Sequence, residues 1–369
     1  MKKRTILATL AAGAVALSMT ACGSSTSAGN GGGAASGGAT GSGQMQTVKM
    51  MVGGIDKQIY LPYKLAEQLG LYKKYGIDMQ LSTEQDGGVG AEDAMASGQV
   101  DMAGAWYLHT FDFQSKGKDV IDVVQLSGAP GERIMCSPNA NVHSGADIKG
   151  KKMGVTDLGS GTDTLTQFVA AKAGVKKSDY ATVKAGAGAT AIAAIKNGLA
   201  DCVMTTQPTV TAMESKGVAQ SAIDLATTDG ATAAVGGNWP AASVLAQSSW
   251  VKDHESAVQG VVNALVETMQ WIKTHSAQEI ADKLPADYTA NKNITKDDYV
   301  KALTQDKGQF LPDGIMPAGG PKTIAAMETQ IGMDISKVTV GNTFTNKYAL
   351  KALDTLGLKP TTTPAGADG

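Results

Sequence analysis

Hydrophobic and polar positions alternate in two successive runs that share one order of elements. Strands are predicted at residues 47–52, 77–81, 100–104, 153–156, 181–184 and 201–204. Helical spacing separates these strands at residues 62–69, 91–96, 164–173 and 191–196. Each run therefore reads β-α-β-α-β, which is typical of an α/β lobe.

A short internal repeat supports two related lobes. The segment that ends at Gly98 and Asp101 matches the segment that ends at Gly198 and Asp201, 100 residues later. In both copies the glycine is expected to end a helix and the aspartate to begin a strand. Open α/β sheets bind ligands beyond the carboxyl ends of their strands, so we expect a site between the lobes.

The predicted strand ends of the first lobe supply most of the candidate ligand-binding residues. These residues are Gly54, Asp56, Lys57, Asp86, Gly87, Trp106 and Tyr107. The two aromatic residues would form a stacking wall for a ring or an alkyl chain, and the alternative is that they fill the lobe core. Asp56 and Lys57 could contact a charge on the ligand.

In the second lobe, a glycine-rich turn precedes the helix predicted at residues 164–173. Ser160, Gly161 and Thr162 would present hydroxyl and backbone N–H groups at the positive end of that helix. The alternative is that Ser160 or Thr162 only caps the helix. Gln207, which follows the last predicted strand, is a neutral hydrogen-bonding candidate.

The charged residues leave the sign of the ligand open. Outside the first four residues the chain has one arginine, Arg133, which could bind a carboxylate or a sulfonate. Acidic residues near the expected cleft make a neutral or cationic ring compound nearly as plausible as an anion. With 34 acidic against 32 basic residues, nothing indicates nucleic-acid binding.

The first 44 residues are predicted to lie outside the globular fold. Residues 1–21 have the basic and apolar segments of a signal peptide, and Met19 to Cys22 resemble a bacterial lipobox, with methionine where leucine is usual. This resemblance implies lipidation of Cys22. Residues 23–44 contain almost only Gly, Ser, Ala and Thr, so residues 22–44 are expected to form a flexible tether.

The remaining cysteines and the histidines do not suggest a metal site. Cys136 and Cys202 lie in apolar, strand-like runs, where buried free thiols are favoured over a disulfide. The four histidines are scattered singly, without the spacing of zinc ligands. No cofactor is expected.

Several segments resemble the bacterial substrate-binding proteins for nitrate, sulfonates, taurine and thiamine-precursor pyrimidines. The resemblance lies in Gly70-Leu71, Gly76-Ile77-Asp78, residues 96–101, residues 149–155, Gly159-Ser160 and residues 198–201. It implies a type II periplasmic-binding-protein fold, in which two α/β lobes joined by two crossovers close on a solute.

The expected organisation follows from this resemblance. Residues 45–127 and 241–357 would form the first lobe, residues 128–240 the second lobe with both crossovers, and residues 358–369 a disordered tail. The protein would be a monomeric lipoprotein on the outer face of the cytoplasmic membrane that delivers a small solute to the permease and ATPase subunits of an ABC importer. Alternatives are a receptor for a signalling partner and, less favoured, a pyrimidine-synthase-like enzyme.

Overall fold

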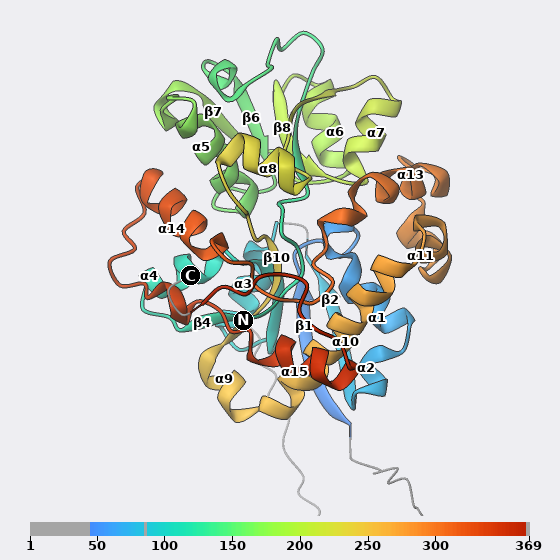
Figure 1. The fold of residues 1–369 in the computed structure, drawn as a ribbon. Helices are drawn as coiled ribbons and strands as arrows, with labels where there is room; N and C mark the ends of the chain where they lie inside the picture. The colour runs from blue at the N-terminus through green and yellow to red at the C-terminus, as the bar shows by residue number, and fades with distance from the viewer. Residues whose placement is uncertain (1–44, 85–86, 367–369) are drawn as a thin grey trace, which may run out of the picture. The chain divides into compact units, whose positions relative to one another are not determined.

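Two five-stranded sheets organise residues 45–84 and 87–366, the part of the chain that the computed structural model describes (Figure 1). The first sheet has the order β2-β1-β3-β10-β4 and the second the order β7-β6-β8-β5-β9. In each sheet four strands run in one direction, and the fourth strand in the order runs antiparallel to both of its neighbours. The type II periplasmic-binding-protein fold with two α/β lobes is thus confirmed.

The strands of the first lobe are β1 (Gln46–Val52), β2 (Ile77–Thr83), β3 (Met102–Trp106), β4 (Val120–Gln125) and β10 (Ala242–Gln247). Those of the second lobe are β5 (Glu132–Cys136), β6 (Lys152–Val155), β7 (Ala181–Lys184), β8 (Cys202–Thr206) and β9 (Gln220–Asp224). Because β4 and β5 belong to different sheets, residues 126–131 cross between the lobes, and residues 225–241 return between β9 and β10.

Helices cover both faces of the second sheet, with α5 on one side and α6 and α7 on the other (Figure 1). The helices before β10 are α1 (Leu61–Gln68), α2 (Leu71–Lys74), α3 (Val89–Ala96), α4 (His109–Ser115), α5 (Gly161–Lys172), α6 (Ala189–Lys196), α7 (Thr209–Ser215) and α8 (Thr228–Val235). Those after it are α9 (Ser248–Asp253), α10 (Glu255–Thr274), α11 (Ala277–Lys283), α12 (Ala286–Thr289), α13 (Lys296–Asp306), α14 (Gly320–Gln330) and α15 (Lys347–Leu356).

The long helix α10 shows how the sequence pattern builds the core. Its apolar residues recur at intervals of three and four, so Val258, Leu265 and Met269 lie on one buried face. On the opposite side of the helix, Gly260 allows close approach to β2, since a β-carbon there would lie 2.8 Å from the side chain of Ile77. None of the helices in the described part of the chain is both long and apolar enough to cross a membrane.

The internal repeat has the same hydrogen bonds in both lobes. A carboxylate oxygen of Asp101 accepts a hydrogen bond from the backbone N–H of Lys49 at 2.8 Å, and Asp201 accepts one from Lys152 at 2.8 Å. Both aspartates immediately precede the central parallel strands β3 and β8. They therefore fix the register of equivalent strands in the two lobes.

Two expectations from the sequence are wrong. Cys136 and Cys202 are not free thiols but form a disulfide, because they face each other across the antiparallel pair of β5 and β8. The tail predicted to be disordered is held through residues 361–365. There the backbone and hydroxyl groups of Thr361 and Thr362 donate to the carboxylate of Asp313, and the N–H of Ala365 donates to a backbone carbonyl.

Candidate functional site

The lobes meet at the carboxyl ends of their parallel strands. The backbone N–H of Gln58 donates to the carbonyl of Gln207 across this junction at 2.9 Å. The ring of Trp106 from the first lobe lies against Gly161 of the second, where a β-carbon would be only 2.5 Å from the ring. Contact this close requires glycine at position 161.

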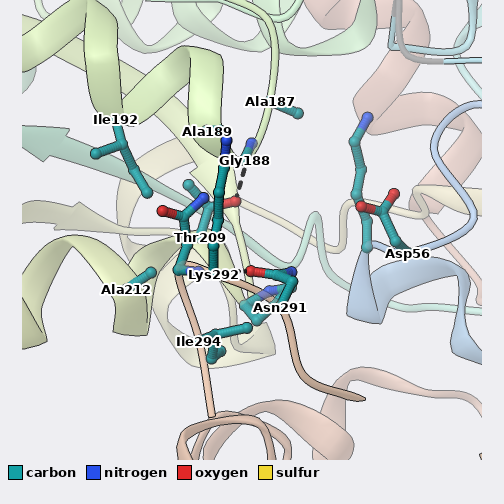
Figure 2. Close-up of a pocket in the computed structure, with 13 residues that line it drawn as sticks. Asp56, Ala187, Gly188, Ala189, Ile192, Thr209, Ala212, Asn291, Lys292 and Ile294 are labelled. Atoms are coloured by element: carbon teal, nitrogen blue, oxygen red, sulfur yellow. Dashed lines mark hydrogen bonds between the residues drawn. The ribbon is translucent and has the colours of Figure 1, made fainter. Parts of the chain in front are cut away.

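A cavity of about 520 Å³ opens beside this junction (Figure 2). Asp56 and Lys57 line it from the segment that follows β1. Residues 187–189 line it from the segment after β7, and Pro208 and Thr209 from the end of β8. Both lobes therefore contribute the kind of strand-end segment that binds ligands in α/β proteins.

A third wall comes from a segment that belongs to no strand end. Residues 291–294, between α12 and α13, close the cavity opposite α6. Figure 2 shows Asn291 and Lys292 facing the same space as Thr209, with Asp56 across the opening. This wall had no signal in the sequence, because it lies between two helices far along the chain from the predicted strands.

The cavity combines an apolar surface with a few polar groups. The apolar part is lined by Ala187, Ala189, Ile192, Pro208, Ala212 and Ile294. Asp56 and Lys292 are exposed at its rim, whereas Thr209 is engaged within the wall, where it accepts a hydrogen bond from the N–H of Gly188 at 3.2 Å. The volume and the mixed lining suit a small organic solute.

Lys57 is the buried cation of the site. Its ammonium group donates to the carbonyl of Gly53 at 2.7 Å, and its side chain packs against Gly54, which has a φ of +97°. Glu132, the first residue of β5, is buried near this lysine. Burial raises the pKa of Glu132 to about 8, although Lys57 and Arg133 oppose the shift.

The turn at residues 159–162 has the geometry of a helix cap. Ser160 is the N-cap of α5, because its hydroxyl oxygen accepts a hydrogen bond from the backbone N–H of Asp163 at 3.4 Å. The same hydroxyl donates to the carbonyl of Asp157 at 2.7 Å. Thr162 accepts a hydrogen bond from the N–H of Thr156 at 2.9 Å. The structure thus contains the capping interaction that the sequence left open. It brings Ser160 against Gly87 of the first lobe, where a β-carbon would lie 3.1 Å from Ser160.

The two aromatic candidates lie in different surroundings. Tyr107 is fully buried, contacts Phe111 and Phe344 edge-on and is hydrogen-bonded to Thr343, so it fills the core of the first lobe. Trp106 lies at the contact between the lobes. The stacking wall proposed for both residues is therefore incorrect for Tyr107.

Arg133 and Gln207 are engaged within the protein. The guanidinium of Arg133 donates to both carboxylate oxygens of Asp306 at 2.7 and 2.8 Å and to Asp224 at 3.1 Å. The side-chain carbonyl of Gln207 accepts hydrogen bonds from Thr211. Arg133 therefore connects β5 to α13 and β9. The remaining candidate, Asp86, lies outside the described residues.

A second group of buried ionisable side chains comprises Glu92 of α3, His109 of α4 and Glu328 of α14. Burial alone would lower the pKa of His109, but Glu92 and Asp112 raise it to about 9. Glu328 is fully buried, and burial raises its pKa to about 8. Within the described residues, no group of His, Cys, Asp and Glu side chains could hold a metal ion.

Comparison with known proteins places this geometry in context. Residues 59–279 match the family described as NMT1/THI5 like. A solved structure of a protein from Bordetella bronchiseptica RB50 is 30% identical to the chain, with a TM-score of 0.78. The alignment covers 84% of this chain and 98% of that one.

More distant similarities support the fold. The periplasmic nitrate-binding protein NrtA from Synechocystis PCC 6803 has a TM-score of 0.69 at 14% identity, over 88% of this chain and 93% of its own. The alkanesulfonate-binding protein SsuA from Xanthomonas axonopodis pv. citri has a TM-score of 0.61 at 18% identity, over 82% and 99%. A 4-amino-5-hydroxymethyl-2-methylpyrimidine phosphate synthase from Legionella pneumophila is 24% identical over 143 residues, which cover 39% of this chain and 44% of the synthase.

Proposed function

Because the chain belongs to the NMT1/THI5-like family, we propose that it is an extracytoplasmic solute-binding protein that captures a small solute between its lobes for an ABC importer. The observation that carries this proposal is the cavity of about 520 Å³ that strand-end segments of both lobes line. A solute in this cavity would contact both lobes, and its binding energy would favour their closed arrangement.

Binding of a solute by the full-length chain in mild detergent tests this function. A solute at about a hundred times its dissociation constant should stabilise the fold by about 2.7 kcal/mol, which raises the melting temperature by several degrees. The panel contains nitrate, sulfonates, amino acids, amines, pyrimidines and aromatic carboxylates. If a cooperatively folded protein shows no shift with any compound, capture of these solute classes is refuted.

A pair of lysine variants locates the binding site. Lys292 lines the cavity, whereas Lys301 is exposed on α13 outside the lining. We expect Lys292→Gln to change the affinity for the solute that the panel identifies, and Lys301→Gln to leave it unchanged. Equal effects of the two variants would place the site elsewhere.

We propose further that lipidated Cys22 anchors the protein to the outer face of the cytoplasmic membrane. Cys22 and the signal peptide lie outside the described residues. Metabolic labelling with a radioactive fatty acid should mark the natural chain but not Cys22→Ser. Labelling of both chains would refute this attachment site.

Catalysis is the competing function, because one relative is named as a pyrimidine phosphate synthase. The two cysteines in the described part of the chain are joined in a disulfide, and His109 is buried beside Asp112 and Glu92. Because these cysteines are not free thiols and this histidine is already engaged by carboxylates, we favour solute capture over catalysis. An unaltered solute recovered from the protein after prolonged incubation would support capture, whereas a converted product would support the enzyme.

We propose that the protein delivers its solute to the permease and ATPase subunits of an ABC importer. Neighbouring genes for a permease and an ATPase would support delivery to an importer. A neighbouring gene for a sensor kinase would instead favour the signalling alternative.

A further inference from the structure

Both carboxylates and a cation act near Tyr60, where η1 (Gln58–Tyr60) meets the second lobe, and the ammonium of Lys57 lies 6.0 Å from the centre of the tyrosine ring. Burial raises the pKa of this tyrosine well above its usual value, and the negative charges of Glu92, Glu132 and Glu84 raise it further. Carboxylates that act on one buried hydroxyl must lie close to it, since charge effects fall with distance. The interior beside the cavity therefore contains buried carboxyl groups.

Glu132 is the member of this group that belongs to the second lobe, and like Glu92 it has a buried carboxylate oxygen without a hydrogen-bond partner. It is 2% exposed, and its Oε2 atom has no hydrogen-bond partner. A buried carboxylate oxygen without a donor costs free energy comparable to a lost hydrogen bond or more. The same region also holds Gln309, whose buried Oε1 atom has no partner and lies within 2.2 Å of the position of a β-carbon on Gly131.

The two cations whose charges act on Glu132 also bind other groups. The guanidinium of Arg133 is aimed at Asp306 and Asp224, on the side of β5 that leads to α13 and β9. The ammonium of Lys57 donates to the carbonyl of Gly53. Neither contact satisfies the Oε2 atom of Glu132.

Glu132 lies one strand end from the cavity. It pairs with Thr206 of β8, and Pro208, two residues further on, lines the cavity. The hydroxyl of Thr206 also donates to the carbonyl of Gly131 at 2.6 Å. On the opposite side stands Lys57, which lines the cavity and whose charge acts on Glu132. Glu132 itself is not part of the lining, so a small movement of the lobes is needed to bring a solute to it.

On the basis of the proposed function, we infer that Glu132 accepts a hydrogen bond from a positively charged nitrogen of the solute, so that the cleft takes amines in preference to nitrate or simple sulfonates. A protonated amine would supply the donor that the Oε2 atom of Glu132 lacks, and its hydrogen bond to the ionised carboxylate would be charge-assisted. Above about pH 8, where the carboxyl of Glu132 is ionised, an anion would add negative charge beside it, and Arg133, which could receive the anion, is already paired. Glu132 is thus the specificity-determining residue of this cleft.

The pH dependence of binding follows from the burial of this carboxyl. The charged and titratable groups that act on it or lie beside it are Lys57, Tyr60, Arg133 and Asp306, and its pKa is raised to about 8. An ammonium group binds the ionised carboxylate, so the affinity for an amine should rise as the pH increases from 6.5 to 8.5. An amine-free solute should show no such rise.

Matched probes on the full-length chain in mild detergent test the inference by calorimetric titration. The pairs differ only in the amine: β-alanine and propionate, benzylamine and benzyl alcohol, and taurine and ethanesulfonate, with nitrate as a further anion. At least one amine should bind about tenfold or more tightly than its partner at pH 8. Glu132→Gln keeps the shape of the side chain and should remove this preference and its pH dependence. The control variant Glu214→Gln, at an exposed residue of α7, should keep both.

Each outcome decides the inference. Binding of propionate, ethanesulfonate or nitrate without any preference for amines would overturn it and leave solute capture standing. An amine preference that survives in Glu132→Gln would overturn the role of Glu132. If no probe binds, both the inference and the capture of these solute classes fail.

Discussion

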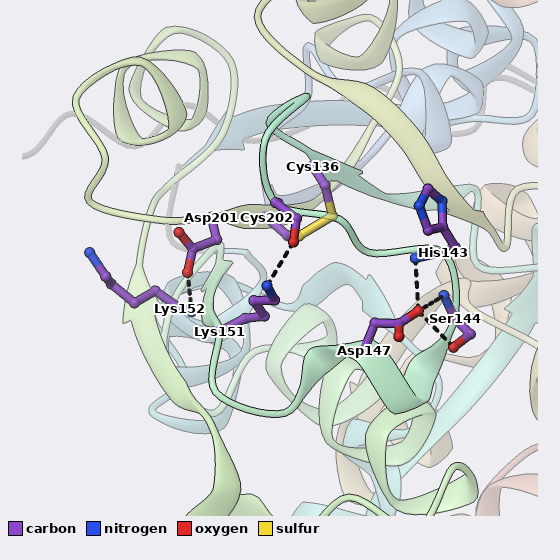
Figure 3. Close-up of a disulfide and its surroundings, with 9 residues drawn as sticks. Cys136, His143, Ser144, Asp147, Lys151, Lys152, Asp201 and Cys202 are labelled. Carbon is purple, nitrogen blue, oxygen red and sulfur yellow. Dashed lines mark hydrogen bonds between the residues drawn. A yellow bond between two sulfur atoms is a disulfide. The ribbon is translucent and has the colours of Figure 1, made fainter.

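Removal of the disulfide between Cys136 and Cys202 should destabilise the protein by about 4 kcal/mol. The bond closes a loop with a sequence separation of 66 residues and joins β5 to β8 at the centre of the second sheet (Figure 3). In the chain-entropy description, a loop of this length removes roughly 15 cal/mol/K from the unfolded state, which is about 4 kcal/mol at 25 °C. For a chain of this size, that corresponds to a fall in melting temperature of roughly 6 °C.

Urea denaturation measures this difference directly. The natural chain, the same chain under a thiol reductant and the variant Cys136→Ala/Cys202→Ala are compared by circular dichroism, with the midpoint and the slope fitted separately. We expect the reductant to lower the midpoint of the natural chain towards that of the double variant and to leave the double variant unchanged. Equal midpoints for the oxidised and reduced natural chain would refute the reasoning, because the cross-link would then not constrain the unfolded state.

Three further predictions follow from packing and burial. Gly161→Val should push the ring of Trp106 away and weaken solute binding at least tenfold in a calorimetric titration. The control variant Gly308→Ala, at a glycine with open space around it, should bind the solute normally. Equal affinities of the two variants would show that the contact between the lobes is dispensable. Asp313→Asn should weaken the hydrogen bonds that hold residues 361–365 and lower the free energy of unfolding by about 1–3 kcal/mol. Limited proteolysis should then cleave this segment faster, and unchanged cleavage would contradict the anchoring role of Asp313. Burial raises the pKa of Glu328 from 4.5 to about 8, so the folded state holds a proton that the unfolded state releases, and stability should fall between about pH 4.5 and 8. Glu328→Gln should reduce the steepest part of this slope by up to about 1.4 kcal/mol per pH unit, and an identical pH profile for the variant would argue against a buried, protonated carboxyl.

Local sequence patterns were sufficient to predict most of the elements, and their errors have local causes. The third strand was predicted at residues 100–104 but is β3, Met102–Trp106. The reason is that the backbone N–H groups of Gln99 and Val100 both donate to the carbonyl of Ala94, which extends the turn after α3. β7 was predicted with its observed bounds, because four alternating residues between turns leave no other strand register.

Features that depend on contacts between distant segments could not be predicted in this way. The disulfide depends on the register between β5 and β8, which apolar runs do not reveal. The cavity wall at residues 291–294 depends on how the connection between α12 and α13 folds back towards α6. The sequence makes Arg133 a candidate for binding an anion, but its guanidinium donates to the carboxylate of Asp306, which lies 173 residues later in the chain.

The paired aspartates that precede β3 and β8 have a consequence for how this protein could diversify. Asp101 and Asp201 fix strand register at the amino ends of the strands, whereas the cavity lies at the carboxyl ends. Mutations that retune the solute preference therefore fall on segments that do not carry the register of the sheets. An ancestor with one duplicated lobe could in this way give rise to receptors for chemically unrelated solutes that all keep the same fold.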